Sequence, residues 1–152
     1  MAPEPGVPPP AGESEATGES TEPVVGSDAE RIAAAQAYID ALVSHDASGV
    51  PFAADCTRIE QGVKNGFSGS HLRRSLNGGP QYRVIGAATP PEFTITGDVV
   101  RARFDILTKV SIAGRRFAAH VDETFVIPAA PINGRNEIHH IRVRFHPFLA
   151  KG

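Results

Sequence analysis

Between residues 28 and 44, apolar positions recur every three or four residues. This spacing predicts a helix with one buried face. The buried stripe consists of Ile32, Ala35, Gln36, Ile39, Leu42 and Val43. Ser27 or Asp28 can cap the first turn, because a side-chain oxygen there accepts hydrogen bonds from free N–H groups. Tyr38 lies at the edge of the stripe, beside Leu42.

The second half of the chain shows the alternation that is typical of strands. The predicted long strands cover residues 93–96, 99–112, 116–127 and 137–147. Ala113-Gly114 is a tight hairpin signal between two of them. Ahead of these strands we expect a helical turn at 50–54, a short strand at 57–63, a helix at 68–76 and an extended segment at 81–87. The pattern therefore predicts an α+β domain, with three helices preceding a strongly curved, mainly antiparallel sheet of about four to six strands.

Alternation also sorts each predicted strand into two faces, because successive side chains point to opposite sides. In residues 99–112 one face carries Val100, Ala102, Phe104 and Ile106. In residues 137–147 one face carries His139, Ile141, Val143 and Phe145. In residues 116–127 one face carries Ala118, His120, Asp122 and Thr124, opposite Phe117, Ala119, Val121 and Phe125. Because both faces of this last strand hold apolar groups, we expect a pocket on one side and a second copy of the chain on the other.

Composition separates the first 27 residues from the rest. They contain six prolines, five glutamates and neither lysine nor arginine. Such a stretch cannot bury enough apolar surface to offset its ordering entropy, so we expect residues 1–27 to be a disordered acidic tail and residues 28–152 to be one domain. Without the five glutamates the formal charge changes from −2 to about +3, which is too mild to indicate nucleic acid as a partner.

Other features restrict where the chain works. No basic flank followed by an apolar run marks a secretory signal, and no segment is long and apolar enough to span a bilayer. The single cysteine, Cys56, excludes an internal disulfide. We therefore expect a cytoplasmic protein without a membrane partner.

Three stretches carry a resemblance to a known family. Residues 38–46, which begin at Tyr38, residues 52–60 and residues 120–122 each resemble an active-site segment of the ketosteroid isomerases. The second stretch, FAADCTRIE, reads like that family's YADDATVED and ends at Glu60. Over about residues 28–147 the chain resembles the nuclear transport factor 2-like (NTF2-like), SnoaL-like and ketosteroid isomerase-like superfamily. The resemblance implies a cone-shaped fold in which helices pack into a curved sheet around a pocket.

The same resemblance implies roles for individual residues. Glu60 stands at the position of the general base, while Tyr38 and a neutral Asp122 would donate to the oxyanion that forms beside it. We therefore expect an isomerase or lyase that transfers a proton next to a carbonyl, without a metal or cofactor. Glu60 is one methylene longer than the family's aspartate, and residue 61 is Gln where the family has Pro.

One cavity is expected to hold the candidate catalytic residues Tyr38, Glu60, His120 and Asp122. Its wall would come from Phe104, Ile106, His139, Ile141, Val143 and Phe145. An apolar pocket with a few convergent polar groups suits a hydrophobic, steroid-like or polyketide-like ligand.

Several alternatives remain open. His120 could pair with Asp122 and keep it ionised, or act itself as the acid–base group of a dehydratase. A metal held by His120, Asp122 and His139 is a weaker alternative, since neighbouring histidines on a strand point to opposite faces. Finally, the chain could be a non-catalytic domain whose pocket binds a ligand or serves dimerisation. In each case we expect a homodimer.

Overall fold

The computed structural model describes residues 27–151. The predicted acidic tail therefore lies outside the described residues, apart from Ser27. Within residues 27–151, no helix combines the length and apolar character that crossing a membrane would require. The cytoplasmic location stays a prediction.

Helix α2 (Asp28–Ser44) starts and ends as its sequence predicts. The Ser27 side chain accepts a hydrogen bond from the Glu30 N–H at 3.1 Å, and His45, with φ of 60°, ends the helix. Arg31 fixes the first turn to the sheet, because its buried guanidinium donates to the backbone oxygens of Ile127 at 2.8 Å and Gly97 at 2.6 Å.

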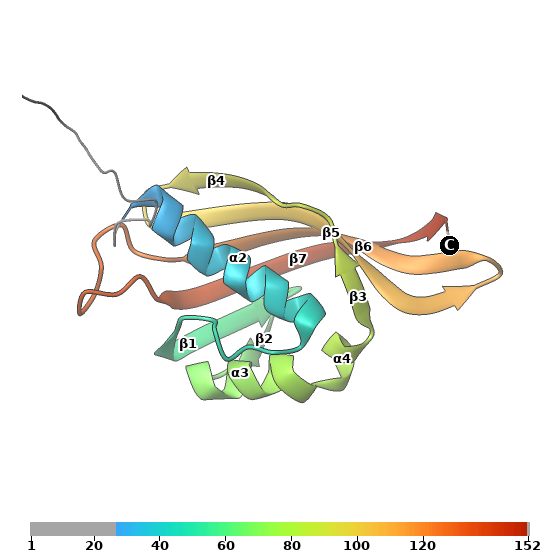
Figure 1. The fold of residues 1–152 in the computed structure, drawn as a ribbon, viewed down its shortest axis with the longest axis horizontal. Helices are drawn as coiled ribbons and strands as arrows, with labels where there is room; N and C mark the ends of the chain where they lie inside the picture. Colours follow the sequence, from blue (N-terminus) through green and yellow to red (C-terminus); the bar gives the residue numbers. More distant parts are fainter. Residues whose placement is uncertain (1–26, 152) are drawn as a thin grey trace, which may run out of the picture.

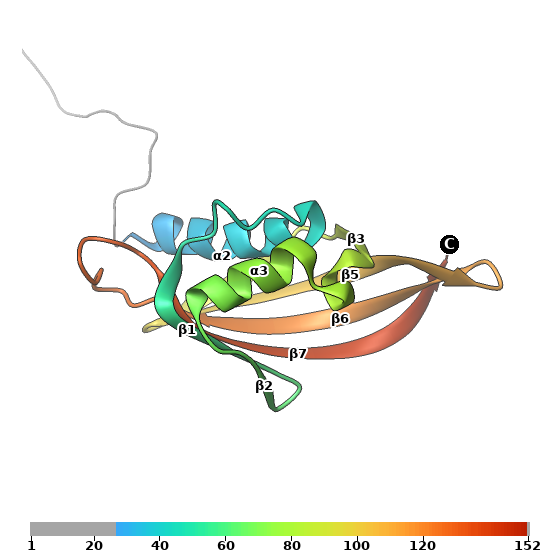
Figure 2. The ribbon, with the colours of Figure 1, turned by 90° about the horizontal axis from the view of Figure 1, so that it is seen from below.

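A seven-stranded sheet forms the other layer. Its strands are β1 (Phe52–Glu60), β2 (Val63–Gly66), β3 (Ile85–Ala88), β4 (Glu92–Thr96), β5 (Val99–Ile112), β6 (Arg115–Val126) and β7 (Ile138–Lys151). The main order is β2-β1-β7-β6-β5-β3, and β4 pairs with β5. All pairings are antiparallel except that of β1 with β7. The sheet curves beneath the helices in Figure 2.

Among the described residues, three helices cover one face of this sheet, and two of them, α2 and α3, were predicted (Figures 1 and 2). Besides α2 they are α3 (Gly69–Gly78) and the one-turn α4 (Pro80–Arg83). A core of side chains between the layers includes Tyr38, whose ring meets that of Phe125 edge-on at 5.4 Å. The α+β class and the curved, mainly antiparallel sheet are thus confirmed.

The segment ahead of the long strands differs in detail from the prediction. Residues 52–54 open strand β1 instead of forming a helical turn, and β1 then runs unbroken to Glu60. Residues 80–83 form α4 where an extended segment was expected, because Pro80 suits the first turn of a helix. The sheet has seven strands rather than four to six, because residues 63–66 turn back and form the separate strand β2, which pairs with β1.

The predicted faces are right for β5 and β7 but reversed for β6. Val121 and Phe125 are buried against the helices, with Phe104 paired to Val121 and Phe125 paired to Ile141. His120 and Asp122 therefore face away from the helices. The homodimer was expected because Phe117, Val121 and Phe125 would otherwise be exposed to solvent. That reason is wrong for Val121 and Phe125, which are buried, whereas Phe117 is 42% exposed.

A homodimer itself stays a prediction. The outer face of the sheet carries charged rows, such as Arg103, Asp122 and Arg144 side by side on three strands. Opposite charges in neighbouring positions can pair across a two-fold axis with a second copy. We expect light scattering at micromolar concentration to give twice the chain mass, and a monomer mass would contradict this.

Candidate active site

A cavity of about 310 Å³ opens between the helices and the inner face of the sheet. Its apolar wall consists of Leu42, Val84, Ile85, Ile106, Phe117, Ala118, Ala119, Val121, Val143, Phe145 and Pro147. Four acidic or phenolic side chains also line it: Tyr38, Glu60, Tyr82 and Glu123. They come from α2, β1, α4 and β6, so each layer of the fold contributes to the site.

The strand register sets the two acids in one row. Val143 of β7 pairs with Glu60 of β1 on one side and with Glu123 of β6 on the other. Two strand spacings separate the backbones of the two glutamates by about 9–10 Å. All three side chains point to the helix side, so the carboxyl groups flank the space above Val143.

Glu60 is held in place by two donors. Its Oε1 accepts hydrogen bonds from Asn65 Nδ2 at 2.8 Å and from the Tyr82 hydroxyl at 3.1 Å. The next residue, Gln61, bonds the backbone of Phe145 through both its amide oxygen and its amide nitrogen, at 2.9 Å each. These contacts fix the end of β1 against β7 and hold the Glu60 carboxyl group at the cavity wall.

Arg58, two residues before Glu60 on the same face, is fully buried. Its Nη1 donates to the Tyr38 hydroxyl at 3.1 Å and its Nε donates to Asn65 Oδ1 at 2.9 Å. The guanidinium also lies over the Tyr82 ring, 5.0 Å from the ring centre. Arg58 thus joins the residues of the site but is not among those that line the cavity.

Glu123 is the buried acid of the cavity, with 2% of its surface exposed. Its pKa is raised to about 8, chiefly by burial; the nearby Glu60 acts in the same direction, while Arg58 and a hydrogen bond with Tyr38 act in the opposite direction. Burial likewise raises the pKa of Tyr38, and the charge of Glu123 adds to this effect. Near neutral pH the site therefore holds a protonated carboxyl and a protonated phenol.

The structure brings some predicted site residues together and not others. Tyr38, Glu60, Ile106, Val143 and Phe145 line the cavity as expected. Phe104 and Ile141 are buried in the adjoining core and do not reach its wall.

His139 also lies outside the cavity wall. It is on the inner face of β7 near the start of the strand, where its Nδ1 lies 4.0 Å from Asp55.

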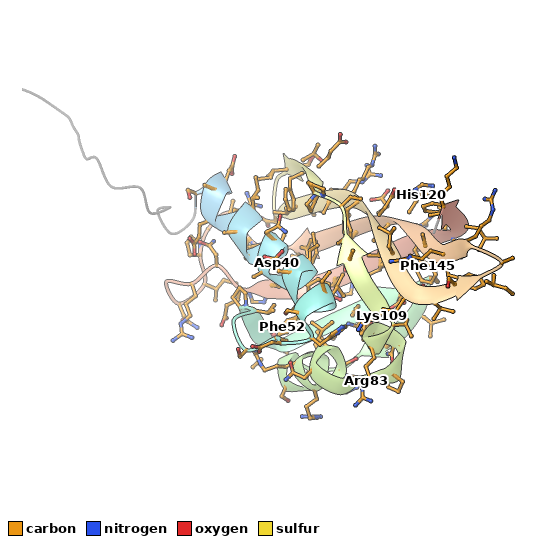
Figure 3. All side chains as sticks on the ribbon, turned by 45° about the vertical axis from the view of Figure 1, so that its right-hand side comes forward. Asp40, Phe52, Arg83, Lys109, His120 and Phe145 are labelled. Carbon is orange, nitrogen blue, oxygen red and sulfur yellow. The ribbon has the colours of Figure 1, made fainter. Side chains whose placement is uncertain are left out.

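The predicted places of Asp122 and His120 are wrong. Asp122 lies on the outer face, where Arg101 Nε donates to its Oδ1 at 2.8 Å, and that hydrogen bond lowers the pKa of the Asp122 carboxyl. His120 Nδ1 lies 2.7 Å from Asp105 on the same face, and its ring stacks on Phe148. Figure 3 shows His120 apart from Phe145 of the cavity wall. Neither residue can act in the pocket.

The metal alternative fails for the same reason. His120 and His139 lie on opposite faces of the sheet, so one ion cannot bind both. Among residues 27–151, no group of three or more His, Cys, Asp or Glu side chains is placed to hold a metal.

Four site residues escaped the sequence analysis: Arg58, Asn65, Tyr82 and Glu123. A signal existed for Glu123, because it alternates with Val121 and Phe125 on the more apolar face of its strand. Arg58 shares the inner face with Glu60, so strand alternation could have found it too. Tyr82 lies on the one-turn helix α4 and Asn65 on the four-residue strand β2, and the sequence analysis predicted neither element.

The sequence over residues 25–145 matches the family described as "Domain of unknown function (DUF8021)". The chain belongs to this family. A search among curated proteins finds no match.

Solved structures with the same fold are NTF2-like proteins. An NTF2-like protein from Burkholderia xenovorans is 16% identical, with a TM-score of 0.58 over 79% of this chain and 92% of that one. An LEH-like epoxide hydrolase of M. tuberculosis is 19% identical, with a TM-score of 0.58 over 78% and 84%. AclR, a putative hydroxylase from Streptomyces galilaeus, is 16% identical, with a TM-score of 0.55 over 79% and 91%. The chain therefore has the NTF2-like fold, as its resemblance implied.

Proposed function

We propose that the cavity is the active site of an isomerase or lyase that moves a proton next to a carbonyl without a cofactor. The carrying observation is the row Glu60–Val143–Glu123, which sets a carboxylate and a protonated carboxyl on opposite sides of one apolar pocket. This pair is what such a reaction needs, because one group must accept a proton while another stabilises the charge on oxygen.

Glu60 is the base in this mechanism. With its Oε1 occupied by Asn65 and Tyr82, its Oε2 takes the proton from the carbon beside the carbonyl. The electron pair of the broken C–H bond forms a C=C bond, and the carbonyl π electrons move to oxygen. Glu60 then returns the proton to a different carbon in an isomerase, or the electron pair expels a β-substituent in a lyase.

Glu123 takes the role that the sequence had assigned to Asp122. Its proton is directed at the substrate oxygen, where negative charge develops. Tyr38 supports it from behind, because the same hydroxyl accepts from Arg58 and bonds Glu123. Arg58 stabilises the charge of Glu60 through the protein rather than by touching the substrate.

Hydrogen–deuterium exchange at the carbon beside a carbonyl tests this proposal without knowledge of the natural substrate. In D₂O we expect the protein to accelerate exchange in a neutral cyclic ketone such as 2-tetralone, measured by proton NMR. Glu60→Gln should lower the rate about a hundredfold or more, since it removes the base. Glu123→Gln should lower it less, because the amide still donates a hydrogen bond.

The matched control is Asp122→Asn, an acid one residue away on the opposite face. Its exchange rate should equal that of the native protein. A loss in Asp122→Asn as large as in Glu60→Gln would contradict the assignment. Binding of the ketone without exchange would instead support a non-catalytic ligand-binding domain.

Hydration of an epoxide is a second candidate, favoured by the coupling of Arg58 to both carboxyl groups and by the fold shared with the LEH-like epoxide hydrolase. Glu60 would take a proton from water as its oxygen attacks a ring carbon. The C–O bond breaks, Glu123 protonates the departing oxygen, and a diol results. Styrene oxide separates the two candidates, because diol formation without exchange of the ketone favours hydration.

A further inference from the structure

The charged side chains that line the cavity are all acidic. Glu60 and Glu123 face its interior, whereas no lysine, arginine or histidine among residues 27–151 lines it. Arg58, which contacts the lining residue Tyr38, is fully buried and uses its Nε, Nη1 and Nη2 on Asn65 and Tyr38. A ligand in the cavity therefore meets carboxyl groups directly and finds no free cation to pair with.

The formal charges of the site cancel while Glu123 is protonated. The guanidinium of Arg58 balances the carboxylate of Glu60, and the Glu123 carboxyl adds none. Tyr38 and Tyr82 are neutral phenols whose pKa values are raised, chiefly by burial. An uncharged ligand leaves this balance intact, and an anion would add an unpaired negative charge.

The mouth of the cavity is largely apolar, and its exposed polar lining residue, Gln81, is uncharged. Val84 and Phe117 both line it and are partly exposed, at 38% and 42% of their surface. The apolar surface continues from Phe117 to Leu149, which is its pairing partner on β7 and is 44% exposed. Figure 1 shows these strands running beyond the helices. Arg83 follows the lining residue Tyr82 in sequence, yet it lies at the surface and outside the lining (Figure 3).

From these three observations we infer that the cavity selects uncharged, largely apolar molecules with one acceptor oxygen and excludes those with a carboxylate or phosphate. The acceptor oxygen lies at the Glu123 end, and the apolar remainder extends past Phe117 to the mouth. The inference rests on the proposed function and extends it, because it states that the substrates are uncharged. Compounds whose carboxylate or phosphate would have to enter the cavity are thereby excluded as substrates.

The expected discrimination follows from desolvation. An anion that leaves water for this cavity loses its hydration and gains no cationic partner, so its transfer is strongly unfavourable. A ketone of the same length loses little hydration and accepts one hydrogen bond from Glu123. We therefore expect at least a tenfold difference in dissociation constant between the two.

Octan-2-one and octanoate are a suitable pair, because they share chain length and differ in charge. Binding can be followed at about pH 6.5, below the pKa of Glu123, through the methyl NMR signals of Ile106 and Val143. The ketone should shift these signals with at least tenfold tighter affinity than octanoate. Equal affinities, or tighter binding of octanoate, would overturn the inference, as would a failure of the ketone to bind.

Glu60→Gln supplies the matched variant. It removes the carboxylate that balances Arg58, so octanoate affinity should rise at least tenfold while octan-2-one affinity stays within about twofold. Unchanged octanoate affinity would contradict the charge balance. If this variant fails to fold, the titrations of the native protein with octan-2-one and octanoate still test the inference. If the cavity excludes octanoate but the protein does not accelerate hydrogen–deuterium exchange in a ketone, this inference holds and the proposed function is wrong. If the protein accelerates exchange but binds octanoate as well as octan-2-one, the proposed function holds and this inference is wrong.

Discussion

The native chain should lose stability as the pH rises from about 4.5 to about 8, and Glu123→Gln should abolish most of that loss. The pKa of Glu123 is raised from 4.5 to about 8 by burial. In this window the unfolded chain releases the proton while the folded chain keeps it. The folded state thus binds more protons than the unfolded state, and the free energy of unfolding falls as the pH rises.

The size of this effect follows from the pKa difference. Each pKa unit corresponds to about 1.4 kcal/mol, so a group buried this deeply contributes a loss of about 3–5 kcal/mol across the window. Urea unfolding at pH 5 and pH 8 measures it directly. Relative to the native chain, Glu123→Gln should become more stable at pH 8, because its buried amide never has to ionise or hold a proton.

Asp122→Asn provides a control with the opposite sign. The pKa of Asp122 is lowered by its hydrogen bond with Arg101, so its contribution is present above its unfolded pKa and is lost as the pH falls through the lowered value. This variant should leave the difference between pH 5 and pH 8 unchanged. Two results would show that Glu123 ionises normally. The native chain could be equally stable at pH 5 and pH 8, or Glu123→Gln could show the same change in stability between these pH values as the native chain.

The sequence predicted the helix–sheet architecture because the signals for it are local. Apolar spacing identified α2, the Ser27 cap fixed its start, and alternation with Ala113-Gly114 identified the β5–β6 hairpin. The short elements were less predictable. Strand β1 pairs in parallel with β7, which lies about 80 residues later in the chain, and no pattern within residues 52–54 predicts that pairing.

The sequence predicted part of the candidate site, and strand β6 shows why it did not predict the rest. Tyr38 and Glu60 sit on elements whose inner faces the sequence shows clearly, and both line the cavity. On β6 the family resemblance favoured Asp122, whereas alternation set Glu123 among Val121 and Phe125. A one-residue shift on a strand moves a side chain to the other face, so alternation was the stronger guide.

Replacing Arg58 should be the most destabilising single change in the site. Arg58→Gln would leave the half-buried carboxylate of Glu60 without its cation, and would remove the donor to Tyr38. Breaking a buried ion cluster by removing one partner costs about 3–5 kcal/mol, because the remaining charge stays desolvated. Chemical unfolding at pH 7 would measure this as a lower midpoint with an unchanged denaturant slope.

Arg101→Gln is the matched control, since Arg101 also pairs with a carboxylate but does so on the open outer face. Water replaces the lost partner of Asp122 there, so stability should change far less than in Arg58→Gln. Combining Arg58→Gln with Glu60→Gln should recover part of the lost stability, because the second substitution removes the unpaired charge. Equal losses in the two single variants, or no recovery in the double variant, would show that Arg58 stabilises the fold by packing on Tyr82 rather than by charge.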